Sequence, residues 1–165
     1  MKTSISRKRF LLMATLGGSG LLLTQNTLGQ QPDQKPPPLP SDLVKEFVIK
    51  GHGDLPAVKE MLSKEAQLLN ACWDWGGGDF ETALEGAGHM GKKEIAKFLL
   101  EKGARLNIFC AAMLGRLDVV KAILAIDPNL KSSKGPHGLQ LMHHAKKGGT
   151  EALPVLEYLQ SIGAA

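Results

Sequence analysis

The residues best suited to chemistry gather in one stretch, CWDWGGGDF at positions 72–80. It holds both tryptophans of the chain, two acids and three consecutive glycines. A tryptophan side chain offers a large contact area and an N–H donor, which makes it common at binding hot spots. Glycines allow tight turns and positive φ angles. This composition favours a loop that contacts a ligand or partner. The alternative is that one or both tryptophans fold back into the interior.

Acidic residues cluster around the same stretch, at Asp74, Asp79, Glu81 and Glu85. Acid–base hydrolysis needs two positioned carboxylates, and covalent catalysis needs a nucleophile with its base. Nothing in the spacing of these acids demands either arrangement. The glycine run also lacks the Gly-Lys-Ser/Thr ending of a P-loop. We therefore expect no catalytic residues and no enzyme activity, with a cryptic enzyme built on this loop as the alternative.

The five histidines are His52, His89, His137, His143 and His144. Imidazole is a common zinc ligand. Adjacent side chains on a helix point about 100° apart, so His143 and His144 cannot share one ion. His52 and His89 each precede an expected turn between helices, and His137 lies at the tip of an expected loop. The histidines could bind a metal only if the fold gathered them, so the expectation is no metal and no cofactor.

Pairs of short helices are the elements that must position these residues. In the segment 82–107, TALEGAGHMGKKEIAKFLLEKGARLN, apolar residues recur at helical spacing in two runs. Gly91 separates the runs, and Gly103 ends the second, as glycine often does at a helix C-terminus. Helix pairs this short cannot bury their apolar faces alone, so neighbouring pairs must pack beside them.

The same segment resembles the ankyrin repeat. Its start, TALEGA from Thr82, is similar to the Thr-Pro-Leu-His-x-Ala start of that family, and the run 94–104 is similar to the family's second helix. Ala83 replaces the family's proline, and Glu85 replaces the histidine that ties adjacent loops together. The stiffness of the loops at this repeat is therefore expected to differ from that of the family.

Related helix pairs surround this one, and the resemblance implies an all-α ankyrin-repeat solenoid of about four helix–turn–helix repeats. We expect the repeats at about 41–74, 75–107, 108–131 and 132–165, which together make up a domain over 41–165. The link between Asn107 and Ala111 is too short for the projecting hairpin that joins ankyrin repeats, so the loop edge should have a notch there.

In ankyrin folds the loops between repeats project and line a concave binding face. The resemblance therefore implies a protein–protein interaction module, a monomer that binds another protein through this face. The residues expected to contact the partner are Trp73, Asp74, Trp75, Asp79, Phe80 and His137. For His137 the alternative is an exposed turn residue without a role. The alternative function is a small-molecule- or metal-binding protein that uses the loop 73–80.

The first 29 residues have the layout of a signal peptide, with a basic start, an apolar stretch too short to span a membrane comfortably, and a small polar end. The segment SRKRFL at 6–11 is similar to the twin-arginine export motif, with Lys8 in place of the second arginine. The general secretory route and a retained anchor are the alternatives. Residues 30–40, QQPDQKPPPLP, predict an extended linker. We expect an exported, periplasmic or extracytoplasmic protein with no membrane span after cleavage.

The net charge of +4 does not indicate nucleic-acid binding. Four of the 20 Lys and Arg residues lie in the signal segment, which has no acid, and the remaining 16 match the 16 Asp and Glu residues. A neutral mature chain has no surplus positive field for phosphates. Cys72 and Cys110 lack zinc-finger spacing, and we expect them to be unpaired apolar fillers, with a disulfide between them in an exported protein as the alternative.

Overall fold

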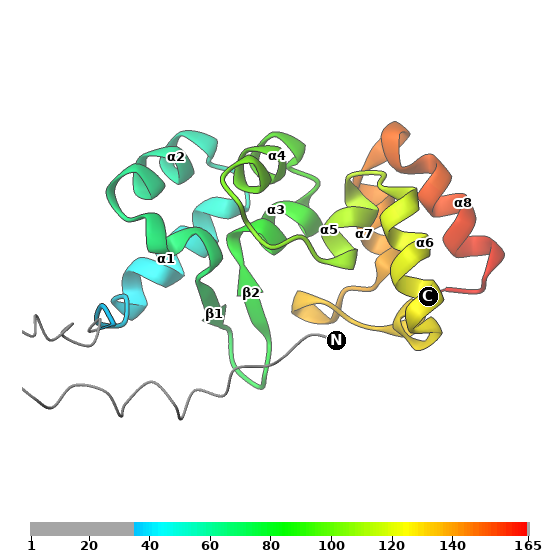
Figure 1. Cartoon of the computed structure of the whole chain (residues 1–165), viewed down its shortest axis with the longest axis horizontal. Coiled ribbons are helices and arrows are strands. Elements are labelled where there is room, and N and C mark those ends of the chain that lie inside the picture. Colours follow the sequence, from blue (N-terminus) through cyan, green and yellow to red (C-terminus); the bar gives the residue numbers. More distant parts are fainter. Residues whose placement is uncertain (1–34, 165) are drawn as a thin grey trace, which may run out of the picture. The chain divides into compact units, whose positions relative to one another are not determined.

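The computed structural model describes residues 35–164, so the expected signal peptide and residues 30–34 of the expected linker lie outside the described part. The described chain is mainly helical (Figure 1). Its α-helices are α1 (Ser41–Gly51), α2 (Leu55–Lys64), α3 (Ala83–Met90), α4 (Lys93–Glu101), α5 (Ile108–Met113), α6 (Leu117–Ile126), α7 (Leu141–Lys147) and α8 (Leu153–Ser161). Short 3₁₀ segments are η2 (Ala66–Asn70), η3 (Pro128–Ser132), η4 (Pro136–Gly138) and η5 (Gly149–Ala152).

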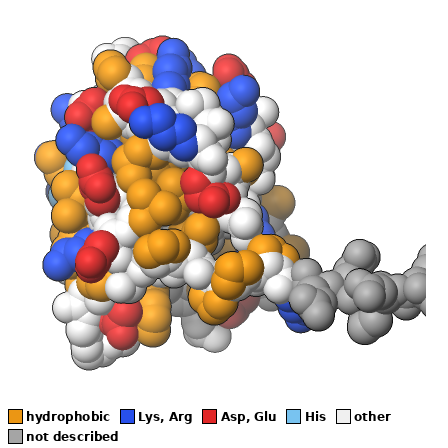
Figure 2. Space-filling model, turned by 90° about the vertical axis from the view of Figure 1, so that its left-hand side faces the viewer, with side chains coloured by type: hydrophobic (Ala, Val, Ile, Leu, Met, Phe, Trp, Pro, Cys, Tyr) orange, Lys and Arg blue, Asp and Glu red, His pale blue; other side chains and the backbone are white. Residues whose placement is uncertain are grey.

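The helices pack as successive pairs. Helices α1, α3, α5 and α7 contact one another in that order, and each also contacts the helix that follows it in the chain. The buried apolar residues form two clusters, one around Phe47, Leu84 and Leu99 and the other around Val120 and Leu141. The prediction of a mainly helical fold is confirmed. Seen from the α1 and α2 end, hydrophobic side chains gather in the middle of the surface and charged ones surround them (Figure 2).

A small sheet corrects the all-α prediction. Strands β1 (Cys72–Asp74) and β2 (Phe80–Thr82) pair antiparallel, so that Trp73 lies opposite Glu81. The turn between them uses the glycine run 76–78, whose three φ angles are 105°, 65° and 87°. Only glycine adopts such angles without strain in consecutive positions. The segment expected to be a plain loop is therefore an ordered hairpin.

The hairpin runs directly into α3, and a capping box fixes the junction. The Thr82 hydroxyl accepts a hydrogen bond from the Glu85 N–H, and the Glu85 carboxylate accepts one from the Thr82 N–H at 2.8 Å. This reciprocal pair satisfies free N–H groups at the start of the helix. Glu85 therefore caps its own helix, and it also accepts a hydrogen bond from the Asn107 side chain at 2.8 Å.

Two glycines bring α1 close to α3. A Cβ at Gly51 would lie 2.6 Å from the carbonyl oxygen of Ala83, and a Cβ at Gly86 would lie 2.9 Å from the ring of His52. Without side chains at these positions, the end of α1 rests on the start of α3 and the His52 ring lies against the α3 backbone. This contact directs His52 toward the hairpin.

No helix within residues 35–164 is long and apolar enough to cross a membrane. Cys72 and Cys110 are both free thiols. Cys110 is buried as an apolar filler, whereas Cys72 is exposed, so the expectation of a filler is wrong for Cys72.

Candidate metal centre

Three histidines and one glutamate converge where the hairpin meets α3. His52 follows the end of α1, Glu81 lies on β2, His89 lies near the end of α3, and His137 lies in η4. One potential ligand atom from each of the four lies within 4.8 Å of the others. The expectation that the histidines are scattered is therefore wrong for three of them, because the packing of α1 on α3 and of η4 on the hairpin gathers them.

The distances between these atoms suit one small cation. The Nε2 atoms of His52 and His137 each lie 3.4 Å from Glu81 Oε2, and the Nε2 atoms of His52 and His89 lie 3.1 Å apart. Tetrahedral zinc with bonds of about 2.0–2.1 Å to nitrogen and oxygen holds its ligand atoms about 3.3 Å from each other. Three of the edges of this cluster already have that length.

The outer nitrogens of two histidines are held by hydrogen bonds. His52 Nδ1 lies 2.9 Å from the Val48 carbonyl oxygen, and His137 Nδ1 lies 2.9 Å from Asp79 Oδ2. Because a carbonyl and a carboxylate only accept hydrogen bonds, each Nδ1 must carry the proton. When these rings are neutral, the Nε2 atom of each presents a lone pair to the centre, which is the arrangement that orients metal-binding histidines.

Glu81 is fully buried, yet it is charged. Burial raises the pKa of its carboxyl group, but hydrogen bonds from the protonated rings of His52 and His89 and from the Trp75 indole outweigh burial and lower that pKa to about 2. His89 Nε2 lies 2.8 Å from Glu81 Oε1, and the indole N–H of Trp75 donates to Glu81 Oε2 at 2.8 Å. The hydrogen bond to Glu81 in turn raises the pKa of His52 against the opposing effect of its own burial.

The cluster therefore needs a positive charge at its centre. A buried carboxylate faces Nε2 atoms whose protons, in the neutral rings of His52 and His137, sit on the other nitrogen. Lone pairs that face each other in a poorly solvated site repel, and a buried carboxylate is costly without a cation. Protonated histidines can supply this charge, and a bound metal ion can supply it with neutral rings.

The third histidine of the cluster, His137, lies in a strained loop that specific contacts hold in place. His137 is the one non-glycine residue of the described chain with a positive φ angle, 58°. Such a conformation costs on the order of 1 kcal/mol or more, so it persists only where contacts enforce it. Asp79 provides those contacts, since its carboxylate accepts from the backbone N–H of His137 at 2.8 Å and from the ring. The segment reaches toward β2 in Figure 1.

The six residues predicted to contact a partner divide into two groups. Trp75, Asp79 and His137 surround the cluster and hold or extend it. Trp73 is half-buried beside Lys45, Asp74 caps the hairpin turn through the Gly76 N–H, and the side chain of Phe80 is exposed. The structure does not gather these last three residues around one site.

Sequence reasoning missed the roles of His52, Glu81 and His89. One signal was present, because His52 and His89 hold similar places just before the inter-helix turns of consecutive helix pairs. Equivalent positions in neighbouring repeats lie side by side. No comparable signal indicated Glu81, whose inward direction depends on the register of the hairpin.

His143 and His144 stay outside the cluster. His143 Nε2 lies 3.0 Å from the carbonyl oxygen of His89 and links α7 to α3. His144 is buried next to Phe109, with Nδ1 2.9 Å from the Gln140 carbonyl oxygen and no partner for Nε2. Burial lowers the pKa of His144 to about 4, so its ring is neutral.

Comparison of the chain with protein-family models and with curated proteins finds no match.

Proposed function

We propose that this protein binds one divalent transition-metal ion, with zinc as the preferred ion, through His52, Glu81, His89 and His137. The convergence of three imidazole nitrogens and one buried carboxylate oxygen within 4.8 Å carries the proposal. Zinc favours four-coordinate nitrogen and oxygen sites of this kind. Imidazole also suits copper and nickel, which the measurement below distinguishes from zinc.

The proposed role of the ion is to join parts of the chain rather than to catalyse a reaction. Four protein ligands fill a tetrahedral shell, whereas a catalytic zinc keeps one position for water or substrate. The ligands come from α1, β2, α3 and η4, and the last of these lies 48 residues beyond His89. The ion would therefore lock the hairpin and the η4 loop to the α1–α3 contact.

The wider setting is also part of the proposal. The order of helix contacts, with α1, α3, α5 and α7 in a row, supports an ankyrin-like stack of repeats. The signal-like segment 1–29 supports work outside the cytoplasm, in the periplasm or a similar compartment. Export of a folded chain through a twin-arginine route would suit a protein that takes up its ion first.

The decisive experiment is metal analysis of the mature chain purified without a tag. We expect about one zinc per chain after incubation with zinc and gel filtration, and less than a fifth of that in Glu81→Gln and His137→Gln. His143→Gln is the matched control, because Gln can still donate to the His89 carbonyl and His143 is not a ligand. Wild-type protein without stoichiometric metal, or ligand variants with the same content as wild type, would disprove the proposal.

A second function, docking to another protein, is supported by Phe80. Its side chain is 57% exposed on the hairpin, an uncommon place for a large apolar group without a partner. Phe80→Ala tests this role without changing the cluster, since Phe80 contributes no ligand atom. A pull-down from periplasmic extract should recover less partner with this variant. Equal recovery of the partner by the wild type and by Phe80→Ala would show that Phe80 is not an anchor.

A further inference from the structure

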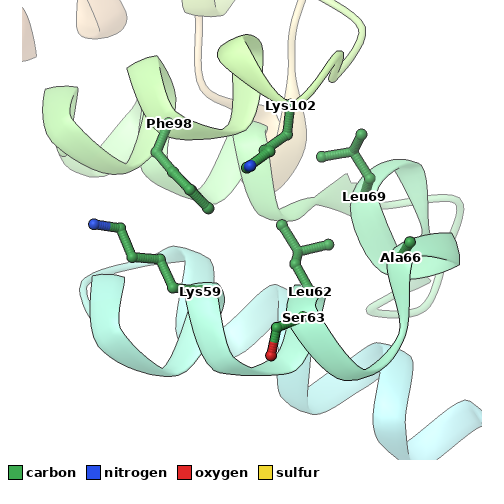
Figure 3. Close-up of a pocket in the computed structure, with 7 residues that line it drawn as sticks. All are labelled: Lys59, Leu62, Ser63, Ala66, Leu69, Phe98 and Lys102. Atoms are coloured by element: carbon green, nitrogen blue, oxygen red, sulfur yellow. The ribbon is translucent and has the colours of Figure 1, made fainter.

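A groove of 610 Å³ lies between α2 and α4. Figure 3 shows α2 along one wall, α4 along the other, and η2 closing one end. The residues that line it are Lys59, Leu62, Ser63, Ala66, Leu69, Phe98 and Lys102. It shares no residue with the metal centre, so what it binds is independent of the proposed function.

The groove combines an apolar floor with two positive charges at its rim. Leu62, Leu69 and Phe98 point into the space between the helices (Figure 3). The ammonium groups of Lys59 and Lys102 lie 5.3 Å and 5.7 Å from the centre of the Phe98 ring. No acidic side chain lines the groove.

Neither lysine is neutralised within residues 35–164. Lys59 lies on α2 and Lys102 directly after α4. The other lysines of these two helices have partners close by, since Lys64 pairs with Glu60, Lys97 with Glu94 and Lys93 with Glu151. Lys59 and Lys102 make no salt bridge with any described residue and instead lie over an aromatic ring, where a cation gains only a modest attraction. Their charges are therefore available to an anionic ligand.

We propose that this groove binds an acidic peptide segment of a partner protein, with an apolar side chain inserted between Leu62 and Phe98 and flanking carboxylates paired with Lys59 and Lys102. The charge complementarity selects an acidic partner, because both rim charges are positive and the lining between them is mostly apolar. The groove runs between two helices of ten and nine residues, a length of about 15 Å that suits an extended or helical segment.

The proposal is tested with fluorescein-labelled decapeptides and fluorescence anisotropy. The probe carries a central Leu-Phe pair with two Glu residues on each side. One comparison peptide has Gln in place of every Glu, a second has Ser in place of Leu and Phe, and a third has Lys in place of every Glu. We expect the acidic apolar peptide to bind at least about tenfold more tightly than any of the other three.

Charge reversal in the protein supplies the second arm. The double variant Lys59→Glu/Lys102→Glu should lose about tenfold in affinity for the acidic peptide and gain affinity for the Lys peptide. The matched control is Lys64→Glu/Lys97→Glu, which changes the same charge on the same two helices outside the groove. Circular dichroism checks that both variants are folded.

Two outcomes would overturn the proposal. One is that the acidic peptide binds the groove variant and the control variant equally, or binds neither of them nor the wild type at millimolar concentration. The other is that decanoate, a small amphiphilic carboxylate, binds the wild type but not Lys59→Glu/Lys102→Glu, while none of the peptides binds. That result would assign the groove to a small ligand. Zinc content should be the same in the wild type and in both double lysine variants. A failure of the peptide proposal would therefore leave the proposed metal centre untouched.

Discussion

The carboxylate of Glu81 is a buried charge that the surrounding side chains must compensate. It has no exposed surface, and it is ionised because the protonated rings of His52 and His89 and the Trp75 indole hold its pKa near 2. A charge in that position needs compensation, and every group within reach is either an imidazole or the indole of Trp75. A buried glutamate of this kind is costly without a cation beside it, since a neutral residue would cost less to bury.

His144 differs from Glu81, because it is buried without an oppositely charged partner. Its pKa falls to about 4 in the folded chain, whereas an unfolded chain would titrate it near its ordinary value of 6.5. Between these two values the unfolded state binds a proton that the folded state does not bind. The contribution of His144 to stability is therefore complete above pH 6.5 and is lost as the pH falls toward 4.

We predict that the free energy of unfolding of His144→Leu depends less on pH between pH 4 and pH 6.5 than that of the wild type. Wild-type protein should lose on the order of 3 kcal/mol more than the variant between pH 6.5 and pH 4, because Leu has no proton to bind. Urea unfolding at closely spaced pH values measures the difference. The metal-free form should be used for both proteins, so that loss of the ion does not contribute. Parallel curves for the two proteins would contradict the assignment.

At the scale of elements, the helices could be predicted from the sequence and the hairpin could not. Helical spacing and the turn glycine Gly91 predicted α3 and α4, because a helix of eight or nine residues repeats its pattern more than twice. Strands of three residues show too little alternation to be recognised, and the glycine run indicated only a turn. The direction of Glu81 follows from strand register, which a single sequence of this length does not determine.

The packing of α1 on α3 leads to a prediction at Gly86. Gly86→Ala should raise the helix propensity of α3, while its new methyl group would lie 2.9 Å from the His52 ring and push it away. We expect metal affinity to fall about tenfold or more, with stability of the metal-free protein changed by less than about 1 kcal/mol. Competition with a zinc indicator measures the affinity.

Gly88→Ala is the matched control on the same helix. A Cβ there would lie 3.7 Å from Cys110, an ordinary contact, and would not approach a ligand. Equal affinity losses in the two variants would show that α3 responds to any added methyl group, and that the position of His52 is not what decides binding.

At the scale of the whole described chain, the centre joins segments that the sequence keeps far apart. The mainly helical class and the succession of helix pairs were predictable from periodicity and turn residues. The meeting of η4 with the hairpin was not, because it depends on long-range contacts of His137 with Asp79 and Glu81. Such contacts leave no local pattern in a single sequence.

This arrangement predicts a large effect of the ion on thermal stability. Free zinc at a hundred times its dissociation constant adds about 2.7 kcal/mol to the free energy of unfolding. For a domain of this size that corresponds to a Tm increase of roughly 10 °C, which EDTA should reverse. Differential scanning calorimetry measures the shift. His137→Gln should show little of it, and an unchanged Tm on chelation of the wild type would contradict the role given to the ion.

The order of the ligands along the chain has a consequence for biosynthesis. His52, Glu81 and His89 all lie between the end of α1 and the end of α3, while His137 is translated 48 residues after His89. A ribosome-bound chain can therefore present three of the four donors while the remainder is still being made. Capture of the proposed ion would then begin on an unfinished polypeptide, and arrival of the η4 loop would complete the set of four ligands.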